Sequence, residues 1–391
     1  MPHAGKVITF YRELKGWSVA HLGAAIGVKE RQMYNIEGSA TVPEPLSRRE
    51  LLTRLLNIPP ALLGVLALDY LPEQQVILPE AGRAIALPPS TIEAYEGVLV
   101  LAWESYYTSS AQRSASTVAL WLAHLKDSLG TVSGVAQDQL RALLCRFYQL
   151  SGVIARDRVD FALALAHGNE ALALALHLRN AELVASALYR RARTYVEMHE
   201  YDLAIADLER ALPYAGRSRD PLRCYTNICL AEAYSLAAPA DLSLQKKSLN
   251  LLDEVGRTVR AHGVLSGDGS FVKVDAPGLY MVRGDVLRRF GRLEDAQDAL
   301  LIVRDHLPKN FTRWQGNLLV SEAELCYADR DIAGACDLAL DALDLLDETR
   351  SSSTRAKIEG LYERLTVAAP RHSDVKRLEQ RLFQPPVREG W

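Results

Sequence analysis

The sequence predicts an all-α protein in two parts, a small helical head and a long array of paired helices. Apolar residues recur at i, i+3, i+4 and i+7 over most of the 391 residues, and strand patterns are almost absent. Proline-rich stretches at 41–47 (TVPEPLS) and 71–90 (LPEQQVILPEAGRAIALPPS) interrupt that periodicity, and small residues return at fixed spacings beyond residue 130. The parts predicted from these observations are a head at 1–70, a linker at 71–90, a repeat domain at 91–385 and a tail at 386–391.

The composition is ordinary for a soluble globular protein, with 49% hydrophobic and 24% charged residues. The net charge of −3 gives no overall attraction to nucleic acid or membranes, yet residues 1–57 hold eight basic and five acidic side chains. That segment is therefore +3 and the remainder −6. No apolar run reaches the ~20 residues that a membrane-spanning helix needs, and no secretory signal is present. We expect a cytoplasmic protein without a membrane partner.

The head is expected to begin with two helices. The first, at 6–15, should turn four side chains inward, namely Val7, Phe10, Tyr11 and Leu14. Ser18 suits the N-cap of a second helix over 19–26, because its hydroxyl can accept a bond from an unpaired backbone N–H. Gly27 can take the left-handed conformation that ends this helix.

A third and a fourth helix should follow. The third, at 29–36, carries more long polar side chains on its outer face than a purely structural helix needs, and Gly38 ends it. Ser47 and Glu50 form an S-x-x-E capping box that should open a fourth helix over 48–57. The second and third helices, joined by a Gly-containing turn, make a helix-turn-helix, whose second helix can lie in the DNA major groove.

The head resembles the Xre/Cro repressor-type domain over roughly residues 4–70. It departs from that family at Val19, where many members have Gln at the start of the second helix. The residues that carry the resemblance are Leu22, Gly23, Ile26, Gly27, Val28, Met33, Ile36 and Glu37-Gly38, preceded by Gly16-Trp17-Ser18.

The resemblance implies that the third helix reads double-stranded DNA. Its base-reading positions are Glu30, Arg31, Tyr34 and Asn35 in this sequence. Arg31 can offer two donors to guanine, Asn35 can pair with adenine, and Glu30 can accept from cytosine. Contacts to phosphates, which position the protein without specifying sequence, would come from Ser18, Lys29 and Gln32. The alternative is a helix-turn-helix kept as a dimerisation or docking module that binds no DNA.

Small residues in the second part obey a spacing rule. A second small residue follows the first after 12 positions, and a third follows after 7 more. The first markers lie mostly 39–40 residues apart. Because only small side chains let antiparallel helices approach closely, this pattern predicts helix hairpins. The sets are Gly152, Ala164 and Ala171; Ala192, Ala204 and Ala211; Gly284, Ala296 and Val303; and Ala323, Ala335 and Ala342, with Ala231 as a further first marker before an irregular insert.

These spacings resemble the tetratricopeptide repeat, most closely at 280–308, although the units are longer than the usual ~34 residues. An unrelated Ala-rich helical bundle is the alternative. A repressor-type head joined to such an array resembles the peptide-pheromone-sensing regulators of Gram-positive bacteria, the RRNPPA group. That resemblance implies a head that binds promoters and a concave repeat face that binds a short peptide. It also implies a homodimer formed through the repeats.

Inward positions of the first helix of each pair are the candidate effector contacts. Amide side chains such as Asn227 and Asn317 suit an extended peptide, because they both donate to and accept from its backbone. A packing or solvated role is the alternative for each residue, and a protein partner remains open beside a peptide. The candidates are Tyr189, Arg193, Asn227, Met281, Asp285, Arg288, Asn317 and Glu324.

Signals for catalysis, metals or cofactors are not found. The nine histidines are scattered without an H-x-x-x-H pair, and the Gly-rich stretch at 263–271 lacks the Lys of a phosphate loop, so it is interpreted as a loop between helices. The five cysteines form no C-x-x-C pair and are expected to be reduced, buried thiols. We expect a sequence-specific transcriptional regulator that is not an enzyme; the alternative is an interaction scaffold whose head does not read DNA.

Overall fold

The computed structural model describes residues 4–39, 46–56, 58, 63, 89–108, 111–216, 220–266, 271–308, 311–349 and 351–383. The chain divides into two compact units, residues 1–83 and 84–391, and this division falls within the predicted linker. The linker itself, apart from residues 89 and 90, and the predicted tail lie outside the described residues.

The described part of the first unit consists of short helices around a small core. Leu22 of the second helix and Met33 of the third are fully buried. Ser18 caps the second helix as predicted, because its Oγ accepts from the backbone N–H of His21 at 3.0 Å. Gly27 takes the left-handed conformation with φ 72°. The helices are α1 (Ala4–Leu14), α2 (Val19–Ala25), α3 (Glu30–Gly38) and α4 (Leu46–Leu56).

The predicted inward face of α1 is wrong at two positions. Phe10 is 61% exposed and Leu14 is 71% exposed, whereas Ile8 is fully buried. The cause is the close approach of α1 to the end of α3. The backbone N–H of Gly5 donates to the Ser39 carbonyl at 3.0 Å, and any side chain at Gly5 would collide with the carbonyl of residue 37. This contact rotates α1 so that the face of residues 5, 8 and 12 packs inward.

The predicted start of the fourth helix is also shifted. Helix α4 begins at Leu46, so Ser47 lies inside its first turn and is not the residue that precedes the helix. Helix boundaries derived from capping patterns commonly shift by one or two residues.

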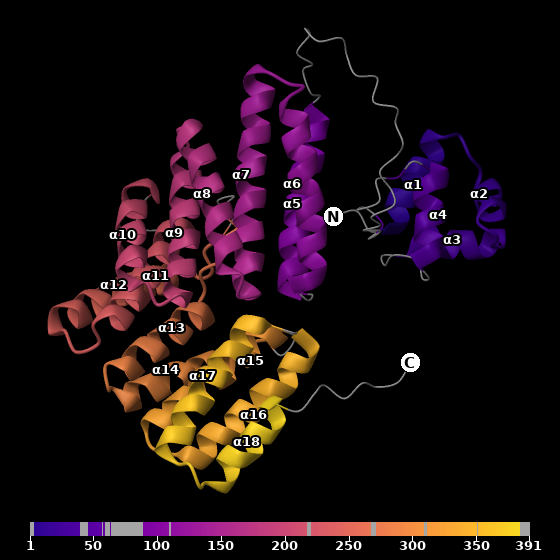
Figure 1. Cartoon of the computed structure of the whole chain (residues 1–391). Helices are drawn as coiled ribbons and strands as arrows, with labels where there is room; N and C mark the ends of the chain where they lie inside the picture. The colour runs from indigo at the N-terminus through magenta and orange to yellow at the C-terminus, as the bar shows by residue number, and fades with distance from the viewer. Residues whose placement is uncertain are drawn as a thin grey trace. The chain divides into compact units, whose positions relative to one another are not determined.

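The described residues of the second unit form seven consecutive helix pairs (Figure 1). The odd-numbered helices α5 to α17 pack against one another in succession. The pairs are α5 (Pro89–Thr108) with α6 (Ala111–Leu129), α7 (Gly134–Asp157) with α8 (Phe161–His177), α9 (Ala181–Glu197) with α10 (Tyr201–Ala211), α11 (Pro221–Ala237) with α12 (Leu242–His262), α13 (Ala276–Arg289) with α14 (Leu293–His306), α15 (Thr312–Ala328) with α16 (Ile332–Thr349), and α17 (Ser352–Ala368) with α18 (Ser373–Phe383).

The small residues mark close approaches of paired helices, as predicted. A Cβ atom at Gly284 of α13 would lie 2.7 Å from Cδ2 of Leu300 in α14. In the irregular unit the second marker comes later, at Ser248, whose Oγ donates to the Ala231 carbonyl at 2.7 Å. All the predicted alanine markers are buried. The all-α class with paired helices is therefore present in this unit, and the part described contains no strand beyond the isolated bridge between Leu265 and Val274.

The turns inside the pairs repeat as well. Val159, His199, Gly291 and Arg330 all adopt positive φ, between 62° and 73°. In the first of these turns, the N–H of residue 160 donates to the Ala155 carbonyl at 2.9 Å, which is the bond of a Schellman motif. Only one of the four positions holds the glycine that this backbone conformation favours.

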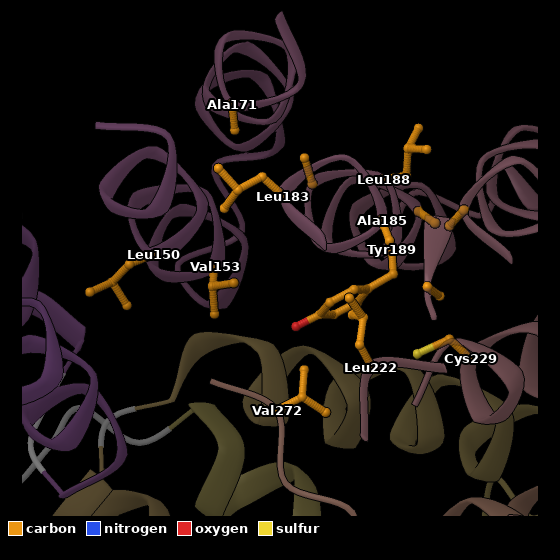
Figure 2. Close-up of a cluster of buried hydrophobic side chains, with 14 of the residues drawn as sticks. Leu150, Val153, Ala171, Leu183, Ala185, Leu188, Tyr189, Leu222, Cys229 and Val272 are labelled. Carbon is orange, nitrogen blue, oxygen red and sulfur yellow. The ribbon is translucent and has the colours of Figure 1, made fainter. Parts of the chain in front are cut away.

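The largest cluster of buried apolar side chains among the described residues takes members from both helices of the first pairs and extends to α13; part of it is shown in Figure 2. Polar contacts also join distant repeats. Oδ1 of Asp157, at the end of α7, accepts from the hydroxyls of Ser351 at 2.9 Å and Ser353 at 3.0 Å, at the start of α17. None of the helices within the described ranges is both long and apolar enough to cross a membrane.

Candidate nucleic-acid interface and odd-helix face

The outer face of α3 presents four of the predicted base-reading residues to solvent. Glu30, Arg31 and Asn35 are exposed, and Tyr34 is 58% exposed. Helix α3 is held against α2 by close backbone packing, because a Cβ at Gly23 would lie 3.1 Å from the Val28 carbonyl oxygen. The packing of α3 against α2 thus orients these side chains outward from a fixed support.

A buried arginine fixes the position of α3, and the sequence did not single it out. Nε of Arg12 donates to Oε1 of Glu37 at 2.6 Å, and its Nη1 donates to the Trp17 carbonyl at 2.9 Å. The hydrogen bond to Glu37 raises the pKa of Arg12, against the opposing effect of burial. Because the partners lie 25 residues apart, no local pattern signals the pair. Arg12 therefore connects α1, the start of α2 and the end of α3.

Two of the predicted phosphate contacts already serve as caps. Ser18 caps α2, and Oε1 of Gln32 accepts from the backbone N–H of Lys29 at 3.1 Å, which closes the first turn of α3. By contrast, the side chains of Arg31, Tyr34 and Asn35 have no hydrogen bond or ion pair with any part of the chain that the structure describes. They are available to a ligand.

The predicted effector contacts all lie on odd-numbered helices, α9, α11, α13 and α15. We call the surface formed by α5, α7, α9, α11, α13, α15 and α17 the odd-helix face. Tyr189 is buried, with its ring 5.3 Å from that of Tyr225 in a T-shaped arrangement. Met281 is buried in an apolar cluster with Leu300 and Leu318.

Apart from Asn227, the polar members of the set join one odd-numbered helix to the next. Arg193 of α9 forms an ion pair with Glu232 of α11. The hydroxyl of Ser321 donates to Oδ2 of Asp285 at 3.3 Å, and that of Thr354 donates to Oδ1 of Asn317 at 3.2 Å. The remaining pairs are Arg288 with Glu324, at 3.5 Å, and Glu324 with Arg364 of α17. Stacking of the repeats thus uses these side chains inside the chain.

Three of the predicted effector contacts have a buried polar atom without a hydrogen-bond partner among the described residues, and Oε2 of Glu324 is one of these atoms. Oδ1 of Asn227, a residue only 2% exposed, and Nε of Arg288 have no hydrogen-bond partner among the described residues. Burial lowers the pKa of Arg288, although the nearby Asp285 and Glu324 oppose the shift. In the neighbouring pair, the charge of Glu232 raises the pKa of Arg193 well above its usual value against the cost of burial.

A pocket of 270 Å³ lies away from these residues, between α12, α13 and α14. It is strongly charged: Nη1 of Arg283 donates to Oδ1 of Asp253 at 2.6 Å, and Nε of Arg292 donates to Oδ2 of Asp295 at 2.7 Å. None of the predicted effector contacts lines it. This pocket therefore does not bring the predicted residues together.

All five cysteines are free, and four are buried as predicted, with Cys326 half-buried. Burial raises the pKa of Cys145 and Cys229 to about 12 and that of Cys224 and Cys336 to about 11. A raised pKa keeps a thiol protonated and unreactive. Within the described ranges, no three His, Cys, Asp or Glu side chains are grouped so that they could hold a metal ion.

Comparisons with known proteins return solved structures of helical repeats. No protein-family model matches the chain, and no curated protein matches it in sequence. A TPR protein of Thermus thermophilus is 17% identical, with 61% of this chain and 100% of that chain covered and a TM-score of 0.37. A Podospora anserina protein of nearly identical TPR-like repeats is 16% identical, with 56% and 96% covered and a TM-score of 0.37. The Rap protein complexed with competence and sporulation factor is 12% identical, with 75% and 97% covered and a TM-score of 0.42.

Proposed function

We propose that the chain is a sequence-specific DNA-binding transcriptional regulator, whose repeat unit forms the homodimer and responds to a peptide or protein effector. The observation that carries the proposal is the outer face of α3. Long polar side chains that could fold back onto the protein instead point outward without an intramolecular partner among the described residues. In a helix-turn-helix, the second helix is the one that enters the major groove.

The chemistry of that face suits base edges. Arg31 presents a planar set of donors that matches guanine O6 and N7, and the Asn35 amide matches adenine N6 and N7. Lys29, exposed at the start of α3, adds a positive charge near the helix N-terminus, where backbone N–H groups also favour phosphate. The +3 charge of residues 1–57 supports the same partner.

The repeat unit supplies the regulatory part of the proposal. Successive odd-numbered helices are joined by hydrogen bonds and ion pairs, so a ligand that separates one such pair would alter the stacking of its neighbours. A dimer formed through this unit would place two copies of α3 on a two-fold DNA site. Half-sites one helical turn apart would then be expected, at about 34–36 Å.

The experiment is selection of bound fragments from sheared source DNA, followed by sequencing. It compares wild type with Arg31→Ala, and with Arg158→Ala as the matched control, because Arg158 is an exposed arginine of the repeat unit. A palindromic motif shared by wild type and Arg158→Ala, and degenerate with Arg31→Ala, is the expected result. Enrichment that is identical in all three proteins would contradict base reading by Arg31.

The second candidate function is an interaction scaffold whose head does not read DNA. The ion pairs and hydrogen bonds between odd-numbered helices favour this scaffold, because they make the odd-helix face a rigid framework. The selection separates the two functions when it is repeated in cell extract, which supplies the effector. A folded protein that enriches no fragment in either condition is a scaffold, and one that enriches only in extract is an effector-gated regulator.

A further inference from the structure

The connection between α12 and α13 differs from the others in the repeat unit. Thirteen residues, 263–275, separate the two helices, more than in any other connection from α5 to α18. Residues 263–266 and 271–275 are described. Within them, Leu265 and Val274 exchange two backbone hydrogen bonds, each 2.9 Å long. This pairing fixes Val274 against Leu265, whereas Phe271, at the start of the second stretch, adopts a left-handed conformation with φ 57°.

The second stretch buries alternate side chains. Val272 is 6% exposed and Val274 is 1% exposed, whereas Lys273 between them faces solvent. Burial of every second side chain is typical of a β-strand, or of an extended peptide that lies with one face against a surface. Among the described residues, this stretch pairs with no strand other than through the isolated bridge between Val274 and Leu265.

The stretch lies against helices that precede it by up to about 170 residues in sequence. The ring of Phe271 stacks on that of Trp103 in α5, with centroids 5.6 Å apart and an interplanar angle of 17°. Val272 belongs to the same cluster of buried side chains as Tyr189 of α9 and Leu222 of α11 (Figure 2). The stretch therefore occupies the odd-helix face formed by the first four repeats.

The floor of this site is fixed by polar groups as well as by apolar packing. The guanidinium carbon of Arg190 lies 5.0 Å from the centroid of the Trp103 ring, and Nη1 of Arg190 donates to Oε1 of Gln149 at 2.7 Å. Arg190, Trp103 and Gln149 are all buried. A tryptophan held in this way is a preformed platform for an aromatic side chain.

We propose that residues 271–274 are a built-in occupant of a peptide site on the odd-helix face. The site takes a peptide in which an aromatic residue is followed by a short extended segment with β-branched residues at alternate positions, as in Phe-Val-Lys-Val. A free peptide of this chemistry competes with the tethered segment for Trp103 and the apolar cluster. The proposal rests on the effector-binding role given above to the repeat unit, and it names the chemistry of that effector.

The tether sets the strength of this competition. A segment held by a short connection acts at an effective concentration on the order of millimolar. A free peptide must therefore exceed that concentration, or make additional contacts, before it displaces the segment. Removal of the Phe271 and Val272 side chains should expose the same site to a free peptide without this competitor.

The test compares peptide binding by three full-length proteins: wild type, the double variant Phe271→Ala/Val272→Ala, and the control Lys273→Ala. The control removes a solvent-facing side chain and its ion pair with Asp275 at 2.8 Å but leaves the Phe271 and Val272 side chains in place. The probe is the labelled hexapeptide Ser-Phe-Val-Lys-Val-Asp, which has the sequence of residues 270–275. Its partner probe, Ser-Ala-Ala-Lys-Val-Asp, lacks the two apolar side chains. Fluorescence anisotropy up to millimolar protein concentration measures both.

The double variant should bind the first probe at least about tenfold more tightly than wild type and Lys273→Ala do, and should not bind the second probe. Adding Trp103→Leu to the double variant should remove the gain. Equal affinities in all three proteins, or no binding by a folded double variant, would overturn the proposal. Should circular dichroism show the double variant unfolded, Phe271→Leu replaces it, and equal affinity of Phe271→Leu and wild type then overturns the proposal.

These outcomes are independent of DNA binding, because no DNA is present in the assay. Peptide binding by the opened protein together with no DNA enrichment would retain the peptide site and reject the regulator. DNA enrichment together with a folded but non-binding double variant would retain the regulator and reject this site.

Discussion

The outer face of α3 and the odd-helix face are both rich in long polar side chains, yet they differ in what those side chains contact. Arg31, Tyr34 and Asn35 have no intramolecular partner among the described residues. Arg193 and Glu324, by contrast, form ion pairs with the next odd-numbered helix. A polar helix face thus indicates a ligand-binding surface only where no neighbouring helix supplies hydrogen-bond or ion-pair partners for its side chains.

The physical reason is the number of neighbouring helices that pack against each helix. Helix α3 belongs to a small unit in which one face packs against α1 and α2. Helices α7 to α15 each have an odd-numbered neighbour on both sides, so charges about 36–40 residues apart in sequence are brought together. Both partners of a partly buried ion pair must be present, because a single charge left without its partner lowers the stability of the fold.

The largest expected effect is a loss of stability when one paired charge of the repeat unit is removed. Arg193→Ala leaves Glu232 partly buried without its partner and should reduce the free energy of unfolding by about 3 kcal/mol. Urea unfolding followed by circular dichroism measures this loss. The double variant Arg193→Met/Glu232→Leu, which removes both charges, should recover to within about 1 kcal/mol of wild type. If Arg193→Ala unfolds at the same urea concentration as wild type, Arg193 is free for an effector and does not stabilise the fold.

The second prediction concerns the other side of the comparison. Arg31→Ala should weaken binding to the selected DNA site by about 1–3 kcal/mol and relax specificity at one base pair, because one bidentate contact is lost. The same change should leave the free energy of unfolding within about 0.5 kcal/mol of wild type. Band-shift titration on the selected and single-substituted sites measures the first effect. A large loss of stability would show that Arg31 has a structural partner.

The third prediction tests the burial of Cys229 on the odd-helix face through the pH dependence of stability. Burial raises the pKa of Cys229 in the folded chain from 9.0 to about 12. Stability from the protonated thiol is therefore complete below pH 9 and is lost as pH rises toward 12, because the unfolded chain ionises first. The loss should be about 1.4 kcal/mol per pH unit from this thiol. Urea unfolding at about pH 8, 9 and 10, which brackets the onset of that loss, should show a shallower decline for Cys229→Ser than for wild type; identical slopes would contradict burial of the ionisable thiol.

The smallest expected effect compares the turns of the two units. Val159 holds a β-branched side chain at φ 63°, where Gly291 stands at the equivalent turn of another pair. Val159→Gly should therefore stabilise the repeat unit by about 0.5–1 kcal/mol, since strain at this backbone conformation is relieved. Gly27→Ala, at φ 72° in the head, should destabilise by a similar amount. Thermal unfolding measures both, and a destabilised Val159→Gly protein would show that Val159 packs favourably at the turn.

Local patterns in the sequence predicted much of the architecture. The spacing of small residues located the helix pairs, because close packing allows no larger side chain at Gly284 or Ala296. The N-cap at Ser18 and the left-handed Gly27 followed from chemistry within four residues. The same kind of reasoning failed for Phe10 and Leu14, because the orientation of α1 is set by the Gly5 contact with the end of α3.

The sequence by itself determined the helical class, the repeat period and the polar outer face of α3. These features depend on periodicity and on interactions within a few residues of the chain. Only the tertiary structure decided which polar side chains are paired and which residues fill the odd-helix face. The partners of Arg12 and Arg193 lie 25 and 39 residues away, and Phe271 meets Trp103 across 168 residues. Such contacts depend on how helices stack in space, and no short pattern in the sequence encodes that arrangement.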